Sequence, residues 1–493
     1  MFVNSIVSLS LFILNLSLGI GADATRGYWN IGDKGFLPMS KGGSCMNTHM
    51  KQFCNTLQTN PTTEEIDKAA ETISISDLFI DDDNNMYPES VIEDTFHWFG
   101  IGLCRIGRNQ NPSGDKTNIP IMVPQSFSYK LTFLSHFLQR EPTTSYASLV
   151  LDNCVYKKIR DDDSDTSTYD DWEIQRTVTI PSEELAHRAE KGFYASHCSV
   201  ELSFADAIKS LKKMEEILKM DIGGVDHDTK VNELTMNLRG MAYNVRKAIP
   251  VLKQMRHYFN SEHFFAHLRP FLKCGNIGEN GIVFEGEEHL TANIHLPNNT
   301  MREIEFNKVL FGFRGPTGAQ TTSLSTIDAG LQIMTSISAD KNLEMTMKEF
   351  RQYHPMAHYT FNDKLSQMSV RDYILSVSDD TDGVTELTDA YNDAVTAVAE
   401  WRYAHVDHVM TYIFKSIPHV PKNAVTGTGN TPISLYLCKS ALGTLKSRIR
   451  TDGIGSKNLP TVSIPFVCSE ECFIGNGCDS CSDYCEDIAK VNK

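Results

Sequence analysis

Three features that would point to common functions are missing from this sequence. Basic residues are not in excess, because 46 Lys and Arg stand against 62 Asp and Glu, which gives a net charge of −16. This balance disfavours nucleic acids and anionic membranes as main partners, since both repel an acidic protein. After the N-terminus, no apolar run is long enough to span a bilayer. The sequence contains no phosphate-binding loop and no dinucleotide-binding glycine pattern, and it has no internal repeat.

The N-terminus, in contrast, has a pattern typical of export. Residues 5–20 are almost entirely apolar or small, and Ala22-Asp23-Ala24 supplies small residues at the spacing of a cleavage site. We therefore predict a signal peptide over residues 1–24, cleaved near Ala24, and a secreted, extracellular protein.

The number and placement of the cysteines also suit an extracellular protein. All 12 cysteines follow the predicted cleavage site, and five of them crowd the tail: Cys468, Cys472, Cys478, Cys481 and Cys485. An oxidising environment favours disulfides over a zinc ribbon here, because no second well-spaced pair follows Cys478 and Cys481. The pairing stays open, since the number in the tail is odd. A glycosylation sequon at Asn298 also suits a secreted chain.

Composition divides the mature chain into four parts. Residues 25–160 read as a small, mixed but mostly helical domain, and residues 161–176 as an acidic linker. The linker lacks the glycine and terminal Glu of an EF-hand, so Ca²⁺ binding is disfavoured. Residues 177–445 carry long helical patterns, and residues 446–493 form the cysteine-rich tail. The sequence predicts a mainly α fold with a large helical domain after a smaller one, and we expect a monomer.

The strongest helical pattern covers residues 386–414. Apolar side chains recur there every three or four positions, and neither Gly nor Pro occurs between residues 384 and 416. His405 and His408 lie on this apolar face near its C-terminal end. A buried imidazole in such a place is either a haem ligand or a core histidine bonded to a carbonyl, and the helix alone does not decide between them.

Nine short segments, taken in order, resemble the indoleamine 2,3-dioxygenase family of haem enzymes that break down tryptophan. The segments are GFLP (35–38), a Val-Pro segment (119–124), LVLDNC (149–154), VELSFADAIK (200–209), HFFAHLR (263–269), GAQTTSLSTIDAGLQI (318–333), RQYHPMAH (351–358), WRYAHVDHVMTYI (401–413) and TGTGNT (426–431). The resemblance covers about residues 30–445, and it implies a haem b cofactor with one iron per chain.

The resemblance also implies how the cofactor is held. His405 matches the proximal iron ligand, while Gly318 and Asp328 match positions near the cofactor. His408 falls where the family normally has an aliphatic residue, so we interpret it as a core histidine or a group that supports the ligand.

Phe264, Arg269 and Thr428 match the family's substrate contacts. An indole needs an aromatic wall, and an α-carboxylate is best held by a bidentate guanidinium. Without the resemblance, Phe264 would read as a core residue and Arg269 as half of a surface ion pair. Thr428 lies between two glycines, as expected for a lid that closes over the substrate, although a surface loop without a role has the same composition.

Two positions depart from the family pattern. His197 matches the distal position, where the family usually has a small hydroxyl residue, and a shift of one residue would place Ser196 there instead. We predict a catalytic role for His197, which can hydrogen-bond the indole N–H or bound dioxygen, with Phe193 lining the same wall. Pro316, in the loop before Gly318, removes a backbone donor.

Together these residues imply a dioxygenase that inserts O₂ into the indole C2–C3 bond of L-tryptophan or another indoleamine, giving N-formylkynurenine. An external reductant would keep the iron ferrous. One alternative is a secreted haem- or oxygen-binding protein without turnover, which His197 and Pro316 favour. Another is an adhesion or inhibitor protein that acts through its tail. Phe264, Arg269 and Thr428 favour the enzyme, because oxygen storage needs no carboxylate-binding arginine.

Overall fold

The computed structural model describes most of the chain between residues 28 and 449. The described ranges are 28–38, 46–157, 171–220, 227–333, 341–367, 370–377, 383–416 and 425–449. The predicted signal peptide, residues 161–170 of the predicted linker and the five tail cysteines lie outside them. Helices dominate the described part, which confirms the mainly α fold. None of the described helices has the length and apolar content needed to cross a membrane.

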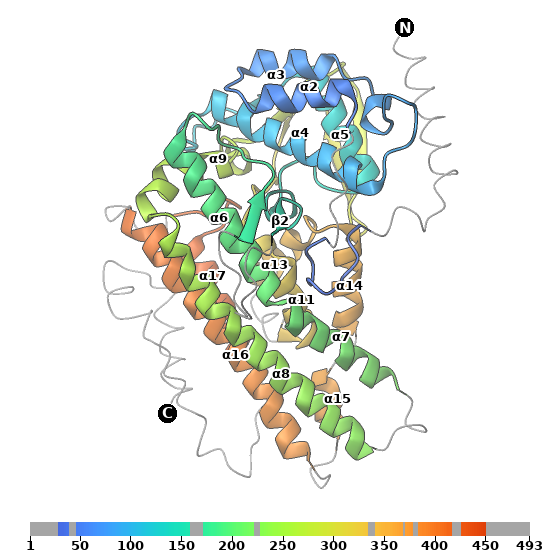
Figure 1. Cartoon of the computed structure of the whole chain (residues 1–493), viewed down its shortest axis with the longest axis vertical. Helices are drawn as coiled ribbons and strands as arrows, with labels where there is room; N and C mark the ends of the chain where they lie inside the picture. Colours follow the sequence, from blue (N-terminus) through green and yellow to red (C-terminus); the bar gives the residue numbers. More distant parts are fainter. Residues whose placement is uncertain are drawn as a thin grey trace.

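The N-terminal part is built around one buried helix. Its helices are α2 (Thr48–Leu57), α3 (Thr63–Glu71), α4 (Glu89–Gln110), α5 (Gln125–Leu138) and the short η1 (Ser76–Leu78) and η2 (Ala147–Leu151), with the longer ones grouped at the top of Figure 1. A reciprocal capping box between Thr62 and Glu65 starts α3. Most of α4 is buried, because its apolar residues surround the helix and α2, α3 and α5 all pack on it.

The following part holds the longest helices. They are α6 (Glu184–Ser203), α7 (Ala205–Lys219), α8 (His227–Gln254), α11 (Thr322–Gly330), α13 (Lys341–Arg351), α14 (Met356–Gln367), α15 (Val370–Ser376), α16 (Val384–Tyr412) and α17 (Ile433–Lys446). Shorter turns are η4 (Met255–His257), η5 (His263–Leu268), α9 (Arg269–Leu272), α10 (Ile277–Asn280), η6 (Gly318–Gln320) and η7 (Phe414–Ser416). The helix predicted over residues 386–414 is α16. It packs along α8 through the lower half of the molecule (Figure 1).

Short strands connect distant parts of the chain. β1 (Ile121–Val123) pairs in parallel with β4 (Ile282–Phe284), and β7 (Val309–Leu310) pairs antiparallel with β4 on its other side. β5 (Thr291–His295) and β6 (Met301–Glu305) form a separate hairpin. β2 (Cys154–Tyr156) pairs with β3 (Trp172–Ile174), so residues 171–176, at the end of the predicted linker, contribute a strand and the buried side chain of Arg176.

A close backbone contact and a disulfide join α4 to the later part of the chain. A methyl group added at Gly107 would lie 2.2 Å from the Cys274 carbonyl oxygen, so any larger residue would force the two segments apart. Gly275 adopts a φ of +68°, which favours glycine. Cys104 and Cys274 form a disulfide at the same place. One hydrophobic core therefore runs through both parts, from Trp29 to Ile449.

A buried charged network reinforces this joint. Asp152 accepts hydrogen bonds from Tyr28, from Nδ1 of His97 at 2.6 Å and from Nη2 of Arg176 at 3.0 Å. Burial disfavours the His97 charge, but Asp152 and then Glu93 outweigh it and raise the pKa of His97. The network ties the N-terminal segment, α4 and the β3 segment to η2.

We expect Asp152→Asn to lower the free energy of unfolding by about 1.5–3 kcal/mol, because it weakens the buried charge-assisted hydrogen bonds of His97 and Arg176, which keep only Glu93 and Asp94 as anionic partners. The measurement is urea denaturation at pH 7. The matched control is Asp206→Asn, which removes an exposed carboxylate paired with Lys209 and should cost less than about 1 kcal/mol. Equal losses in the two variants would contradict a structural role for the network.

Candidate functional site

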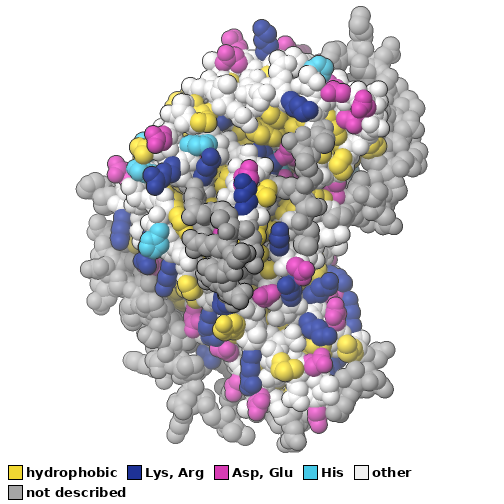
Figure 2. Space-filling model, in the orientation of Figure 1, with side chains coloured by type: hydrophobic (Ala, Val, Ile, Leu, Met, Phe, Trp, Pro, Cys, Tyr) yellow, Lys and Arg dark blue, Asp and Glu magenta, His cyan; other side chains and the backbone are white. Residues whose placement is uncertain are grey.

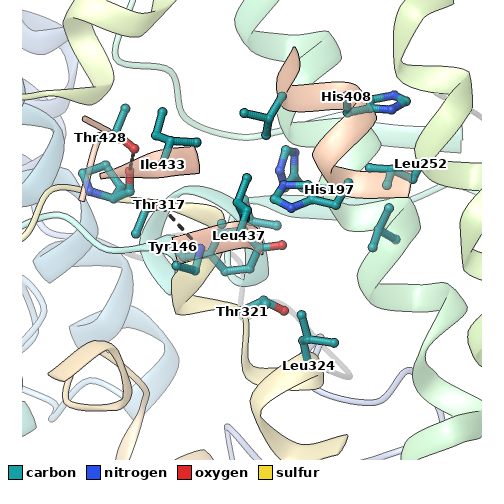
Figure 3. A pocket seen from close by; sticks show the side chains of 18 of the residues that line it. Tyr146, His197, Leu252, Thr317, Thr321, Leu324, His408, Thr428, Ile433 and Leu437 are labelled. Carbon is teal, nitrogen blue, oxygen red and sulfur yellow. Dashed lines mark hydrogen bonds between the residues drawn. The ribbon is translucent and has the colours of Figure 1, made fainter. Parts of the chain in front are cut away.

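A large cavity lies between α6, α16, α17, η5 and the loops that precede α11 and α17. Its lining is mainly apolar and aromatic (Figure 3). The structure brings all the predicted site residues to this one cavity. They are Phe193, His197, Phe264, Arg269, Gly318, Asp328, His405 and Thr428, and His408 and Pro316 join them. Residues more than two hundred positions apart in the sequence therefore meet at a single site.

His197 is held in one tautomer. Its Nδ1 lies 2.8 Å from the carbonyl oxygen of Phe193 on the same helix. Because a carbonyl can only accept, Nδ1 carries the hydrogen and Nε2 keeps a free lone pair. Burial lowers the pKa of His197 to about 4, so the ring is neutral at pH 7. A methyl group added at Gly318 would lie 4.0 Å from Nε2, which places the Gly318 backbone beside it.

His405 is also neutral. Burial, followed by the nearby His408 and His197, lowers the pKa of His405 to about 3. The ring of Trp401 stacks on it at a centroid distance of 5.5 Å and an angle of 13°. A neutral, oriented imidazole in an apolar cavity is the form in which histidine binds a metal.

His408, three residues further along α16, is 8% exposed and lies at the edge of the pocket beside Leu252 (Figure 3). Burial lowers its pKa, while Asp407 and the Ala404 and Leu252 backbones oppose the shift. Neither of its ring nitrogens has a partner with hydrogen-bond geometry. His408 therefore lines the cavity without the carbonyl hydrogen bond expected of a core histidine, and its role, as a core histidine or as a group that supports the ligand, stays a prediction.

Four aromatic rings form one wall of the cavity. The rings of Phe193 and Phe264 lie 5.2 Å apart, and Tyr412 meets Phe264 edge-on at 6.0 Å. Phe259 packs on Tyr412 at 5.2 Å and accepts a hydrogen bond from the Tyr412 hydroxyl through its carbonyl oxygen. Such a wall suits a flat aromatic ligand.

Arg269 places a buried cation at the same wall. Its Nη2 donates to the Thr426 carbonyl oxygen, while its Nε has no partner. No carboxylate of the described residues makes an ion pair with the guanidinium. Burial lowers the pKa of Arg269 to about 10, although Asp115 and Glu279 are near enough to oppose the shift. Burying an unpaired charge is costly, so this arrangement is typical of a residue that receives an anionic ligand.

The loop containing Thr428 closes over this end of the cavity. The Thr428 hydroxyl donates to the Pro316 carbonyl oxygen at 2.6 Å, and Arg314 donates to the Asn430 carbonyl oxygen at 3.0 Å. Pro316, which lacks a backbone donor, thus serves as an acceptor for the loop. Because Arg269 also holds this loop through Thr426, a ligand bound at Arg269 would meet the loop directly.

Sequence reasoning missed two groups around the cavity. Glu201 is buried and accepts hydrogen bonds from Thr321 and Ser323, which ties the Gly318 segment to α6. Its position four residues after His197, on the same helical face, was a usable signal. Arg402 pairs with Asp328 at 2.6 Å, and Arg351 lines the cavity with an unpartnered Nε and Nη2. Neither arginine has a sequence signal of its own.

Comparisons with known proteins agree on one family. The family described as "Indoleamine 2,3-dioxygenase" matches residues 107–445, which is more than half of the chain. Indoleamine 2,3-dioxygenase 1 of Mus musculus is 26% identical over 298 residues, covering 60% of this chain and 63% of the mouse protein. Indoleamine 2,3-dioxygenase 2 of Homo sapiens is 24% identical over 348 residues, covering 67% and 74%. A 6-hydroxytryptophan 2,3-dioxygenase of Fusarium equiseti is 27% identical over 222 residues, covering 43% and 48%.

The unpaired state of Arg269 leads to a prediction about stability. We expect the free energy of unfolding of Arg269→Met to stay within about 1 kcal/mol of the wild type or to rise, because a buried charge without an anion is removed. The control Arg402→Met breaks the buried pair with Asp328 and should cost about 3–5 kcal/mol. Urea denaturation of both variants is the measurement, and a loss at Arg269 as large as that at Arg402 would show that Arg269 has a structural role.

Proposed function

The chain belongs to the indoleamine 2,3-dioxygenase family, and we propose that it uses haem b to cleave the indole C2–C3 bond of L-tryptophan or a related indoleamine. Both atoms of O₂ would enter the product, N-formylkynurenine. The observation that carries this proposal is the buried, unpaired guanidinium of Arg269 beside the aromatic wall of the cavity that also holds His405. An amino-acid indole has the two groups, a carboxylate and a flat ring, that these features accept.

The residues present fit a haem. His405 supplies a neutral imidazole, and the apolar lining suits a porphyrin. Arg351 is a cation in the lining with donors to spare, so it can hold a propionate, whereas Arg402 is already paired with Asp328. When bound, the haem would supply an iron that binds and activates dioxygen.

The side chains of this chain bind, orient and enclose the substrate. The ring of Phe264, backed by Phe193 and Tyr412, would stack on the indole, and Arg269 would hold the carboxylate through Nε and the adjacent Nη. The Thr428 loop would exclude water from the closed site. Nε2 of His197 would accept the indole N–H, because its lone pair is free.

The tautomer of His197 also bears on the alternative of an oxygen-binding protein without turnover. A distal histidine that stabilises bound dioxygen must donate a hydrogen from the nitrogen that faces it. Nδ1 of His197 already donates to the Phe193 carbonyl, so the free nitrogen of the neutral ring can only accept. The contact supports an enzyme that binds an indole N–H better than it supports an oxygen carrier.

The test of the proposed substrate compares L-tryptophan with tryptamine, which has the same indole but no carboxylate. We expect Arg269→Leu to lower kcat/KM for L-tryptophan by about 10- to 100-fold, since it removes charge-assisted hydrogen bonds worth about 1.5–3 kcal/mol. The value for tryptamine should change by less than about threefold, because that substrate never uses the guanidinium. Both are measured from product formation by haem-loaded, reduced protein.

Arg239→Leu is the control, because it removes an exposed arginine far from the cavity on α8 and should leave both values unchanged. Equal losses for the two substrates in Arg269→Leu would remove Arg269 from the carboxylate site.

We also propose that the chain is secreted. Two disulfides among the described residues, Cys104–Cys274 and Cys154–Cys198, support an oxidising compartment. Expression of the full chain in eukaryotic cells should release a protein into the medium whose N-terminal sequence begins near Thr25. Retention inside the cells with residues 1–24 intact would contradict secretion.

A further inference from the structure

We propose that His197 and His405 are both axial ligands of the haem iron in the substrate-free protein. The resting site is then six-coordinate, and the substrate has to displace His197 before dioxygen can bind. The inference rests on the proposed function in one respect, namely that a haem occupies this cavity.

The hydrogen bond of His197 is the first observation. Ligating histidines usually donate their second ring N–H to a carbonyl or carboxylate, which fixes the tautomer and orients the ring. His197 makes such a bond, from Nδ1 to the Phe193 carbonyl oxygen at 2.8 Å. Nε2 therefore carries a lone pair and makes no hydrogen bond with any described residue. The same bond leaves Nε2 available to an iron or to an indole N–H.

The neighbours of His197 hold its ring without covering Nε2. The Phe193 ring lies 4.2 Å from the His197 ring, and Tyr146 meets it edge-on at 5.9 Å. On the side of Nε2 lies Gly318, whose missing side chain would begin 4.0 Å from that nitrogen. Any larger residue at 318 would therefore extend towards the lone pair. Figure 3 shows His197 in the middle of the pocket, well away from the Thr428 loop.

The second imidazole comes from a different helix. His405 lies on α16 and His197 on α6, and both line the same cavity. Two imidazoles supplied by separate helices can bind opposite faces of one porphyrin. His408 cannot replace His197 in this role, because it lies three residues from His405 on the same helix, beside Leu252.

This arrangement couples substrate binding to oxygen binding. When the indole enters against Phe264, its N–H competes with the iron for the same lone pair of His197. Nε2 of His197 would exchange its bond to the iron for a hydrogen bond from the indole N–H. This exchange transfers neither an electron nor a proton. The sixth position would then open only when a substrate is present.

The test is the spin state of the ferric full-length protein loaded with haem, measured by absorption and electron paramagnetic resonance without substrate. We expect the wild type to be low-spin and His197→Ala to be high-spin with the same haem content. His408→Ala, the matched control from the same cavity, should stay low-spin. Added imidazole should return His197→Ala to the low-spin state, and L-tryptophan should convert the wild type to high-spin.

A high-spin wild type, or a low-spin His197→Ala variant, would overturn the six-coordinate state. If that high-spin wild type still forms product from L-tryptophan, the proposed function stands and only this inference fails. A chain that retains no haem would overturn both.

Discussion

The burial of the Arg269 guanidinium without a carboxylate partner is the constraint around which the cavity is organised. Three other buried arginines meet carboxylates: Arg140 with Glu93, Arg176 with Asp152 and Arg402 with Asp328. Arg105 is also buried and donates only to backbone carbonyls, but it does not line the cavity. Arg269 donates to a backbone carbonyl of the closing loop and lies over the Phe265 ring, and it makes no ion pair with a described carboxylate. A buried guanidinium without an anion lowers the free energy of unfolding. A ligand that carries an anionic group would remove this cost when it binds. The aromatic wall from η5 and α16 and the loop around Thr428 both converge on that point.

Around this cation, the histidines of the cavity are neutral. Burial keeps His197 and His405 uncharged at physiological pH, so neither competes with Arg269 for the carboxylate of a ligand. A neutral imidazole also keeps a lone pair for a metal or an N–H group. A cation that can hold an acidic group of the cofactor is Arg351, whose Nε and Nη2 have no partner, while Arg402 pairs with Asp328. Charges of both signs are interspersed over the surface seen in Figure 2.

The sequence predicted the parts of this site that depend on periodicity and on local patterns. The uninterrupted apolar face of residues 386–414 predicted α16, and the nine family-like segments named residues that do line one cavity. The sequence could not show that Nδ1 of His197 is taken by Phe193, because a tautomer depends on the rotamer of a single side chain. It also missed the β1–β4 pairing and the Asp152 network, since three-residue strands and buried ion pairs leave no repeating pattern. The acidic run at residues 161–170 likewise gave no sign that β3 follows directly after it.

The most direct measurement supplies haem-loaded, ferrous protein with L-tryptophan and ¹⁸O₂ and identifies the product by mass spectrometry. A dioxygenase that uses this cavity should release N-formylkynurenine carrying both labelled oxygen atoms over many turnovers. Haem binding with no labelled product, or a product that carries only one labelled atom, would contradict the account.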